Sequence, residues 1–316
     1  MIADAVKEVA SVLDRRFLMF VFVPSLFFWS LLVIVWFAGQ GELHVVATWW
    51  NTPEVFSKVV KISVFLGWVF IFALMMGGQS LNILRFYEGY WVFPGADGLK
   101  KRGIEWHTSV LKDLNERVDA DERAQKKISE AYEKIYHYYP PPDDDNFDEV
   151  MPTRLGNILK ASELYAKDRY EIDSVVIWSR LHKLFPTAFV EEIVLVRSAL
   201  DFMLIITTLS LVFSILSGLY LLIVGAEWWL FLICFWGGLM LAWLAYRSAL
   251  SNAVLYASSI KAGFDLYRHE LLKQLRLPLP KNDIEEKETW EKLGAFIYSN
   301  AALNLPYTDQ APTLQK

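Results

Sequence analysis

Four long apolar segments without a single charged residue constrain this chain more than any other feature. They cover residues 17–37, 62–84, 202–226 and 228–246. Each has about 20 residues, and a helix of that length crosses a hydrocarbon core of roughly 30 Å. Because no water is present there, each segment must satisfy its own backbone hydrogen bonds, which a helix does. The sequence therefore predicts four membrane spans rather than four buried helices of a soluble protein.

Basic residues indicate how the spans are oriented. The loop at residues 39–57 contains no Lys or Arg, whereas basic residues gather beyond the other ends of the spans. They are Lys7, Arg15, Arg16, Arg85, Lys100, Lys101, Arg102, Arg247, Lys261 and Arg268. Loops rich in Lys and Arg stay in the cytosol. We therefore expect a multi-pass protein of the plasma (inner) membrane with both termini cytosolic.

The predicted fold class is an all-α integral membrane protein with two transmembrane helical hairpins and a helical cytosolic domain. Proline disrupts helix interiors, and none occurs in residues 187–224 or 227–275. Long helices are therefore expected to extend from the second hairpin into the cytosol. The expected divisions are an N-terminal tail with the first hairpin (1–84), a cytosolic helical domain (85–201), the second hairpin (202–246) and a cytosolic extension with a tail (247–316).

Helix breakers divide the cytosolic domain into shorter helices, which we expect near residues 98–117, 121–138, 152–170 and 174–185. Thr153 and Asp173 carry side-chain oxygens suited to capping the N-termini of the last two. The acidic, proline-rich segment at 140–149 is expected to be a solvated loop. Span two is expected to continue inward as a helix to about Tyr90.

A stripe of polar residues ends the second apolar segment. Gln79, Asn82, Arg85 and Glu88 follow one another at intervals of three, so they share one side of a helix. Such a stripe must face protein, water or lipid headgroups rather than acyl chains. Two interpretations stay open. The helix leaves the membrane there with Arg85 and Glu88 paired, or several copies of span two line a wetted pore.

Motifs for catalysis and for metal binding are incomplete. The sequence HELLK at His269 begins like a zinc site, but Lys273 stands where the second histidine is required. The acidic loop resembles a calcium loop, but Glu149 replaces its turn glycine and Leu155 its bidentate acid. We therefore predict no enzyme, no metal and no cofactor. The net charge of -5 gives no electrostatic footprint for nucleic acid.

A second set of polar residues, Arg154, Asn157, Asp173 and Arg180, is expected near the inner membrane interface. Helix capping and ion pairing are the ordinary roles of such residues in packed helices. The two arginines also have the chemistry to meet lipid phosphates. For a membrane enzyme, these four residues are the best candidates for active-site groups.

Residues 152–181 resemble a family of bacterial polytopic membrane proteins. The resemblance rests on PTRLGN at the start, RYEID in the middle and a following tryptophan with Arg180 and Leu181, and it extends to LPLPKNDIEEKETWEKL at 277–293. It implies a membrane protein of this architecture and nothing catalytic.

The layout of two hairpins around a helical cytosolic region is similar to that of bestrophin channels. The run RFYEGYW at 85–91 resembles a motif that follows their second span, although Trp91 comes earlier after Glu88 and the Asn-rich signature before the arginine is missing.

We therefore predict a homo-oligomeric channel or pore-like protein in the lipid bilayer. The alternative is a membrane-anchored interaction, sensor or defence-effector module with a cytosolic protein partner. Besides the stripe, the polar groups available to a pore are Thr207, Thr208, Ser210, Ser214 and Ser217.

Overall fold

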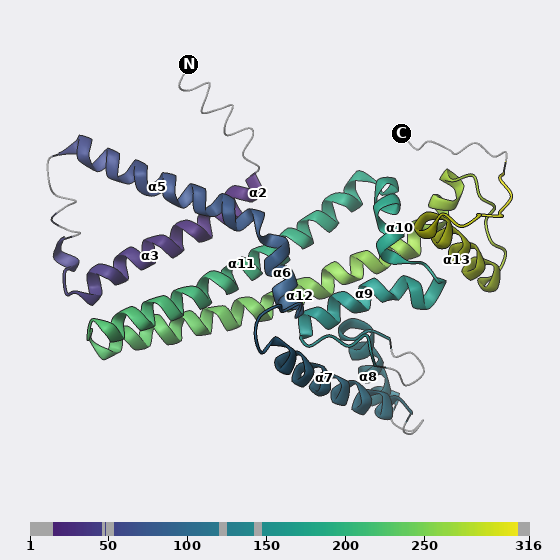
Figure 1. Ribbon diagram of the computed structural model, residues 1–316, viewed down its shortest axis with the longest axis horizontal. Coiled ribbons are helices and arrows are strands. Elements are labelled where there is room, and N and C mark those ends of the chain that lie inside the picture. Colours follow the sequence, from purple (N-terminus) through teal and green to yellow (C-terminus); the bar gives the residue numbers. More distant parts are fainter. Residues whose placement is uncertain (1–14, 46–47, 49–53, 120–124, 142–146, 309–316) are drawn as a thin grey trace, which may run out of the picture. The chain divides into compact units, whose positions relative to one another are not determined.

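The structure is a computed structural model, and within the residues that it describes every regular element is helical (Figure 1). The described residues are 15–45, 48, 54–119, 125–141 and 147–308. The basic residue Lys7 and the middle of the acidic loop, at 142–146, lie outside them.

The chain forms two compact units. Unit 1 comprises residues 1–85 and 198–249, and unit 2 comprises residues 86–197 and 250–316. Two helices, α11 (Thr187–Ile223) and α12 (Trp228–Gln274), contribute residues to both units. Because these helices are continuous, hydrophobicity and residue contacts divide them at slightly different positions. The second hairpin was expected at residues 202–246, and the corresponding part of unit 1 is residues 198–249.

Within the described residues, four helical segments are long and apolar enough to cross a membrane: Leu18–Gly39, Val55–Gly78, α11 and α12. The first joins η1 (Leu18–Phe22) to α3 (Val23–Gly39) after the short α2 (Arg15–Phe17), and the second is α5 (Val55–Gly78). The predicted all-helical class and the two long uninterrupted helices are confirmed.

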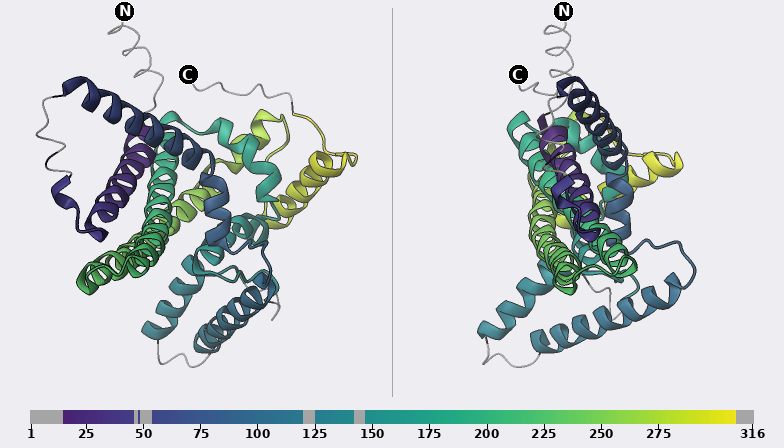
Figure 2. Two further views of the ribbon diagram at one scale, coloured as in Figure 1. Left: turned by 60° about the vertical axis from the view of Figure 1, so that its left-hand side comes forward. Right: turned by 90° about the vertical axis from the view of Figure 1, so that its left-hand side faces the viewer.

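Aromatic side chains join α3 to α5, two consecutive helices that come together at one end and diverge at the other (Figure 2). The rings of Phe28 and Phe72 stack with centroids 5.8 Å apart, and Trp29 meets both Trp68 and Phe72 edge to face. Aromatic pairs of this kind contribute about 0.5–1.5 kcal/mol beyond the area that they bury. Van der Waals contact of this type is the main force between helices in lipid, because lipid tails are as apolar as the helices.

Small residues bring α11 and α12 together in unit 1, where they run side by side (Figure 1). A Cβ added to Gly218 would lie 2.8 Å from the ring of Phe235, and one added to Gly238 would lie 2.8 Å from Cβ of Ser214. The Ser214 hydroxyl donates to the Phe235 carbonyl at 2.6 Å. Ser214, Gly218 and Gly238 therefore lie at the contact between these two helices, where their small size lets the backbones approach closely.

The second span differs from the prediction. Helix α5 ends at Gly78, Gln79 leaves helical geometry with φ -94° and ψ 3°, and a separate helix, α6 (Ser80–Glu88), follows. The chain is therefore helical as far as Glu88, close to the expected end near Tyr90, but the helix is interrupted at Gln79. The adjacent Gly77 and Gly78 are poor helix formers, each about 1 kcal/mol less favourable than alanine, and they weaken the helix where it breaks.

Unit 2 contains the helices expected from the sequence and one that was not predicted. They are α7 (Ala96–Asp119), α8 (Gln125–Tyr138), α9 (Arg154–Tyr170), α10 (Ser174–Leu181), the 3-10 turn η3 (His182–Leu184) and the unpredicted α13 (Asp283–Ser299). Thr153 and Asp173 cap α9 and α10 as predicted, accepting hydrogen bonds from the backbone N–H groups of Gly156 and Val176. Buried Phe264 and Trp290 belong to the main apolar core.

A close backbone contact fixes the start of α9. A Cβ added to Gly156 would lie 2.3 Å from the carbonyl oxygen of Glu88. The Thr153 hydroxyl accepts from the Gly156 N–H at 2.9 Å and donates to the Tyr87 carbonyl at 2.7 Å. Thr153 therefore caps α9 and ties it to the end of α6 with one hydroxyl group.

We predict that Gly156→Ala destabilises the protein, because the new methyl group would overlap a backbone oxygen that has little room to move. A loss of about 3 kcal/mol is expected, seen as a lower unfolding temperature in mild detergent. The control is Gly98→Ala on α7, where an added Cβ has no neighbour within 4 Å. Equal unfolding temperatures for the two variants would contradict this contact.

Candidate functional site

The polar stripe lies at the break between α5 and α6. Gln79, Asn82 and Arg85 are exposed in unit 1, and the Asn82 amide donates to Oε1 of Gln79 at 2.6 Å. Glu88 is the last residue of α6 and is only partly exposed. Its carbonyl oxygen accepts from the Thr153 hydroxyl at 3.0 Å, within unit 2. The structure therefore joins Gln79 to Asn82 and shows that the backbone of Glu88 has a structural role.

A second helix irregularity faces this break. In η1 the backbone N–H of Val23 bonds to the Leu18 carbonyl, which is the wider spacing of a π-helix. Pro24 lacks an N–H, so the normal hydrogen-bond ladder cannot continue through it. Pro24 is the second residue of α3, directly after this π-helical turn. Gly77 packs against this turn, since an added Cβ would lie 3.9 Å from Val21.

Four of the five α11 hydroxyl groups named for a pore, those of Thr207, Thr208, Ser214 and Ser217, donate to backbone carbonyl oxygens, and Ser210 is buried. Thr207 donates to the Met203 carbonyl at 2.7 Å, and Ser217 donates to the Phe213 carbonyl at 2.6 Å. Ser214 is buried against α12, as described above. Thr207 and Ser217 therefore bond within α11 and Ser214 bonds to α12, whereas Gln79, Asn82 and Arg85 of the stripe are exposed.

The second polar set divides by role. Asn157 is fully buried, where it accepts from the backbone N–H of Met151 and donates to two carbonyl oxygens. Asp173 caps α10, and the Arg180 guanidinium donates to the Val176 carbonyl at 2.8 Å. Arg154 lies 5.7 Å over the ring of Trp106. Asn157 and Asp173 thus hold local backbone structure, and the four residues do not form one site.

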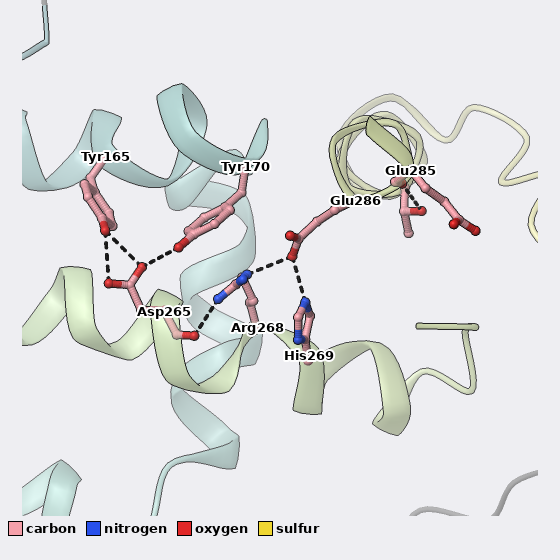
Figure 3. Close-up of polar contacts among 8 residues, drawn as sticks. Tyr165, Tyr170, Asp265, Arg268, His269, Glu285 and Glu286 are labelled. Atoms are coloured by element: carbon pink, nitrogen blue, oxygen red, sulfur yellow. Dashed lines mark hydrogen bonds and ion pairs between the residues drawn. The ribbon is translucent and has the colours of Figure 1, made fainter. Parts of the chain in front are cut away.

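A polar cluster in unit 2 was not predicted (Figure 3). Asp265 of α12 accepts hydrogen bonds from the hydroxyl groups of two tyrosines, Tyr165 at 3.0 Å and Tyr170 at 2.7 Å. Burial, and then the hydrogen bond to this carboxylate, raises the pKa of both tyrosines above the ordinary value. Both therefore stay protonated and continue to donate at physiological pH.

The cluster continues to α13 through Arg268 and His269 (Figure 3). The carboxylate of Glu286 lies 2.8 Å from Nε of Arg268 and 2.8 Å from Nε2 of His269. Burial alone would raise the pKa of Glu286, but the hydrogen bonds from these two residues outweigh it and lower the pKa. The guanidinium of Arg268 also lies 4.0 Å over the ring of Tyr170. Asp265 and Glu286 are thus both engaged by donors, and they join α9, α12 and α13.

Two further titratable groups are buried in unit 2. Burial, together with the charge of Arg154, lowers the pKa of His107 to about 4, so the ring is neutral at pH 7 and bonds to the Tyr139 hydroxyl at 3.1 Å. Lys261 is 4% exposed, donates to the Tyr136 carbonyl and lies 3.8 Å over the ring of Tyr136. The helical spacing of Lys261, Asp265 and Arg268 is visible in the sequence. Their tyrosine partners, about a hundred residues earlier, carry no such signal.

Among the described residues, no group of three or more His, Cys, Asp or Glu side chains is arranged to hold a metal ion. Comparisons with protein-family models, with curated proteins and with solved structures give no match to this chain. Function must therefore be argued from the geometry of the two units.

We predict that Glu286→Gln lowers the stability of the protein at pH 7 by about 2 kcal/mol, because Arg268 would lose its charged partner in a buried position. The folded-state pKa of Glu286 is lowered, so this contribution is present above its unfolded pKa and is lost as the pH falls through the folded value. Thermal unfolding from pH 7 to pH 3 should show the difference between variant and wild type shrinking at acid pH.

The control is Glu288→Gln on the same helix, where the side chain is 61% exposed and pairs with Lys292. Exposed pairs contribute little, so this variant should unfold within about 1 kcal/mol of the wild type. If the two variants were equally stable at every pH, Glu286 would not be holding α13 in place.

Proposed function

We propose that this chain forms a homo-oligomeric, pore-like channel in the plasma membrane, with unit 2 in the cytosol. The pathway runs along the inner end of span two, where Gln79 and Asn82 lie. Several copies surround it, since four spans in one copy leave these residues exposed.

The observation that carries this proposal is the contact between two helix irregularities. The π-helical turn of span one packs against Gly77, directly before the break at Gln79. Single-turn π-helices are frequent at functional sites. Irregular backbone at membrane depth is tolerated where protein or a water-filled cavity surrounds it. Two irregular helix segments in contact suit a gate. A small change of helix direction at the break moves the polar stripe that follows it.

The exposure of span two supports an oligomer. Within one copy, 11% of the apolar window of α5 is buried, against 44% for α11. Helix α5 therefore has free surface for lipid or for other copies. Exposed polar groups at the end of such a helix are costly against acyl chains, and neighbouring copies would cover them.

The second candidate function is a membrane-anchored sensor or interaction module without conduction. One observation favours it: unit 2 holds Lys261 and the tyrosines around it in a buried polar cluster that the spans do not need for packing. Its partners would be cytosolic. We expect no catalytic activity from either arrangement.

The oligomeric mass is the first test of the channel. We expect the purified chain in mild detergent or nanodiscs to give a closed ring of four or more copies by native mass spectrometry. The spans of four copies are enough to surround a central path. A monomer or dimer at every protein concentration would refute the pore and favour the sensor module.

The stripe is tested by ion flux in liposomes. Gln79→Leu combined with Asn82→Leu should lower the flux several-fold, because the substitution removes the exposed amides while keeping the helix. The control is Ser248→Leu, which changes an exposed hydroxyl on α12 that bonds only to the Leu244 carbonyl. Unchanged flux in the double variant would exclude the stripe from the pathway.

The gate is tested by making the break more helical. Gly77→Ala and Gly78→Ala meet no clash, since added Cβ atoms lie 3.8 Å or more from other atoms. Both glycines are the last residues of α5, so the alanines strengthen the helix up to the break, and the open probability of the double variant should change several-fold. Gly67→Ala, in the middle of α5 with no neighbour within 4 Å, is the control. If the double variant had the same open probability as the Gly67→Ala control, the proposal would be contradicted.

A further inference from the structure

A small cleft in unit 2 lies between α8 and α9, with α12 contributing Lys261. Its volume is about 200 Å³. Pockets for drug-sized ligands are larger, at roughly 300–1,000 Å³, so only a small molecule fits. Tyrosines make up much of its wall: Tyr132, Tyr136, Tyr139 and Tyr165.

Lys261 provides a buried positive charge in this cleft. Its ammonium group has three N–H donors, and the backbone carbonyl of Tyr136 accepts one of them. Among the described residues, no carboxylate lies within ion-pair distance of Lys261. The charge of the nearby Asp265 favours the protonated lysine, but its oxygens accept hydrogen bonds from the hydroxyl groups of Tyr165 and Tyr170. A buried charge needs a partner, and the cation–π contact with Tyr136 meets that need only in part.

Arg169 adds a second positive charge. Its side chain is exposed and lines the same cleft, and its guanidinium lies 5.8 Å over the ring of Tyr165. Asp168 is the carboxylate among the lining residues, and it is exposed to water. The described lining therefore carries two cationic groups and one anionic group, which favours an anion.

We propose that this cleft binds a small planar carboxylate. The carboxylate meets Lys261 within the cleft and Arg169 at its edge, and the flat apolar body of the ligand lies against the tyrosine rings. The positive charges of Lys261 and Arg169 favour an anion. The tyrosine rings favour a flat aromatic anion over a compact inorganic ion. This site is independent of conduction, so it stands or fails separately from the pore.

The probe is 4-fluorobenzoate, observed by fluorine NMR with the full-length protein in mild detergent and with empty micelles as the blank. We expect protein-dependent broadening of the fluorine signal. Added benzoate should reverse the broadening, whereas neutral benzamide should not. Inorganic phosphate should also fail to reverse it. If phosphate reversed the broadening as effectively as benzoate, the cleft would bind anions without regard to a flat aromatic body. That result would overturn the proposal.

Two variants test the residues. Lys261→Met keeps a long side chain without the charge, so it preserves the packing, and it should weaken binding about tenfold or more. Arg169→Gln changes an exposed residue and should weaken binding several-fold without affecting folding. The control is Lys273→Met on α12, where the lysine forms an exposed pair with Glu270. Equal broadening by the wild type and by all three variants would refute the site.

Discussion

A backbone N–H group in hydrocarbon has no water to bond to, and the architecture of this chain depends on that constraint. It explains why the apolar segments are helical and why α11 and α12 run without interruption. It also explains how the irregular turns are tolerated. The Ser25 hydroxyl donates to the Val21 carbonyl beside the π-helical turn, and the N–H of Gln79 still bonds to carbonyl oxygens of the preceding turn.

Unit 2 is stabilised in a different way. Its core contains large apolar side chains such as Phe264 and Trp290, but charged groups at the edge of that core join the helices. Asp265 and Glu286 are each surrounded by donors from other helices, which offsets the cost of removing them from water. Tyrosine suits this role because its ring is apolar and its hydroxyl is a donor.

The two proposed roles use different parts of the chain and different physical features. The pore depends on exposed polar groups beside a weak point in two helices. The cleft depends on a buried cation that its surroundings only partly satisfy. A protein with both would have a ligand site in one unit and a gate in the other, connected by helices that belong to both units.

The sequence alone determined the four long apolar helices, the helical class, and the caps at Thr153 and Asp173, because these depend on local composition and on neighbouring residues. It also located the stripe. The tertiary structure decided the break at Gln79, the burial of Asn157 and the cluster around Asp265. A helix break reflects a balance of about 1 kcal/mol per residue, and the partners of Asp265 are about a hundred residues away. Local sequence patterns do not encode contacts between such distant residues, so folding alone brings them together.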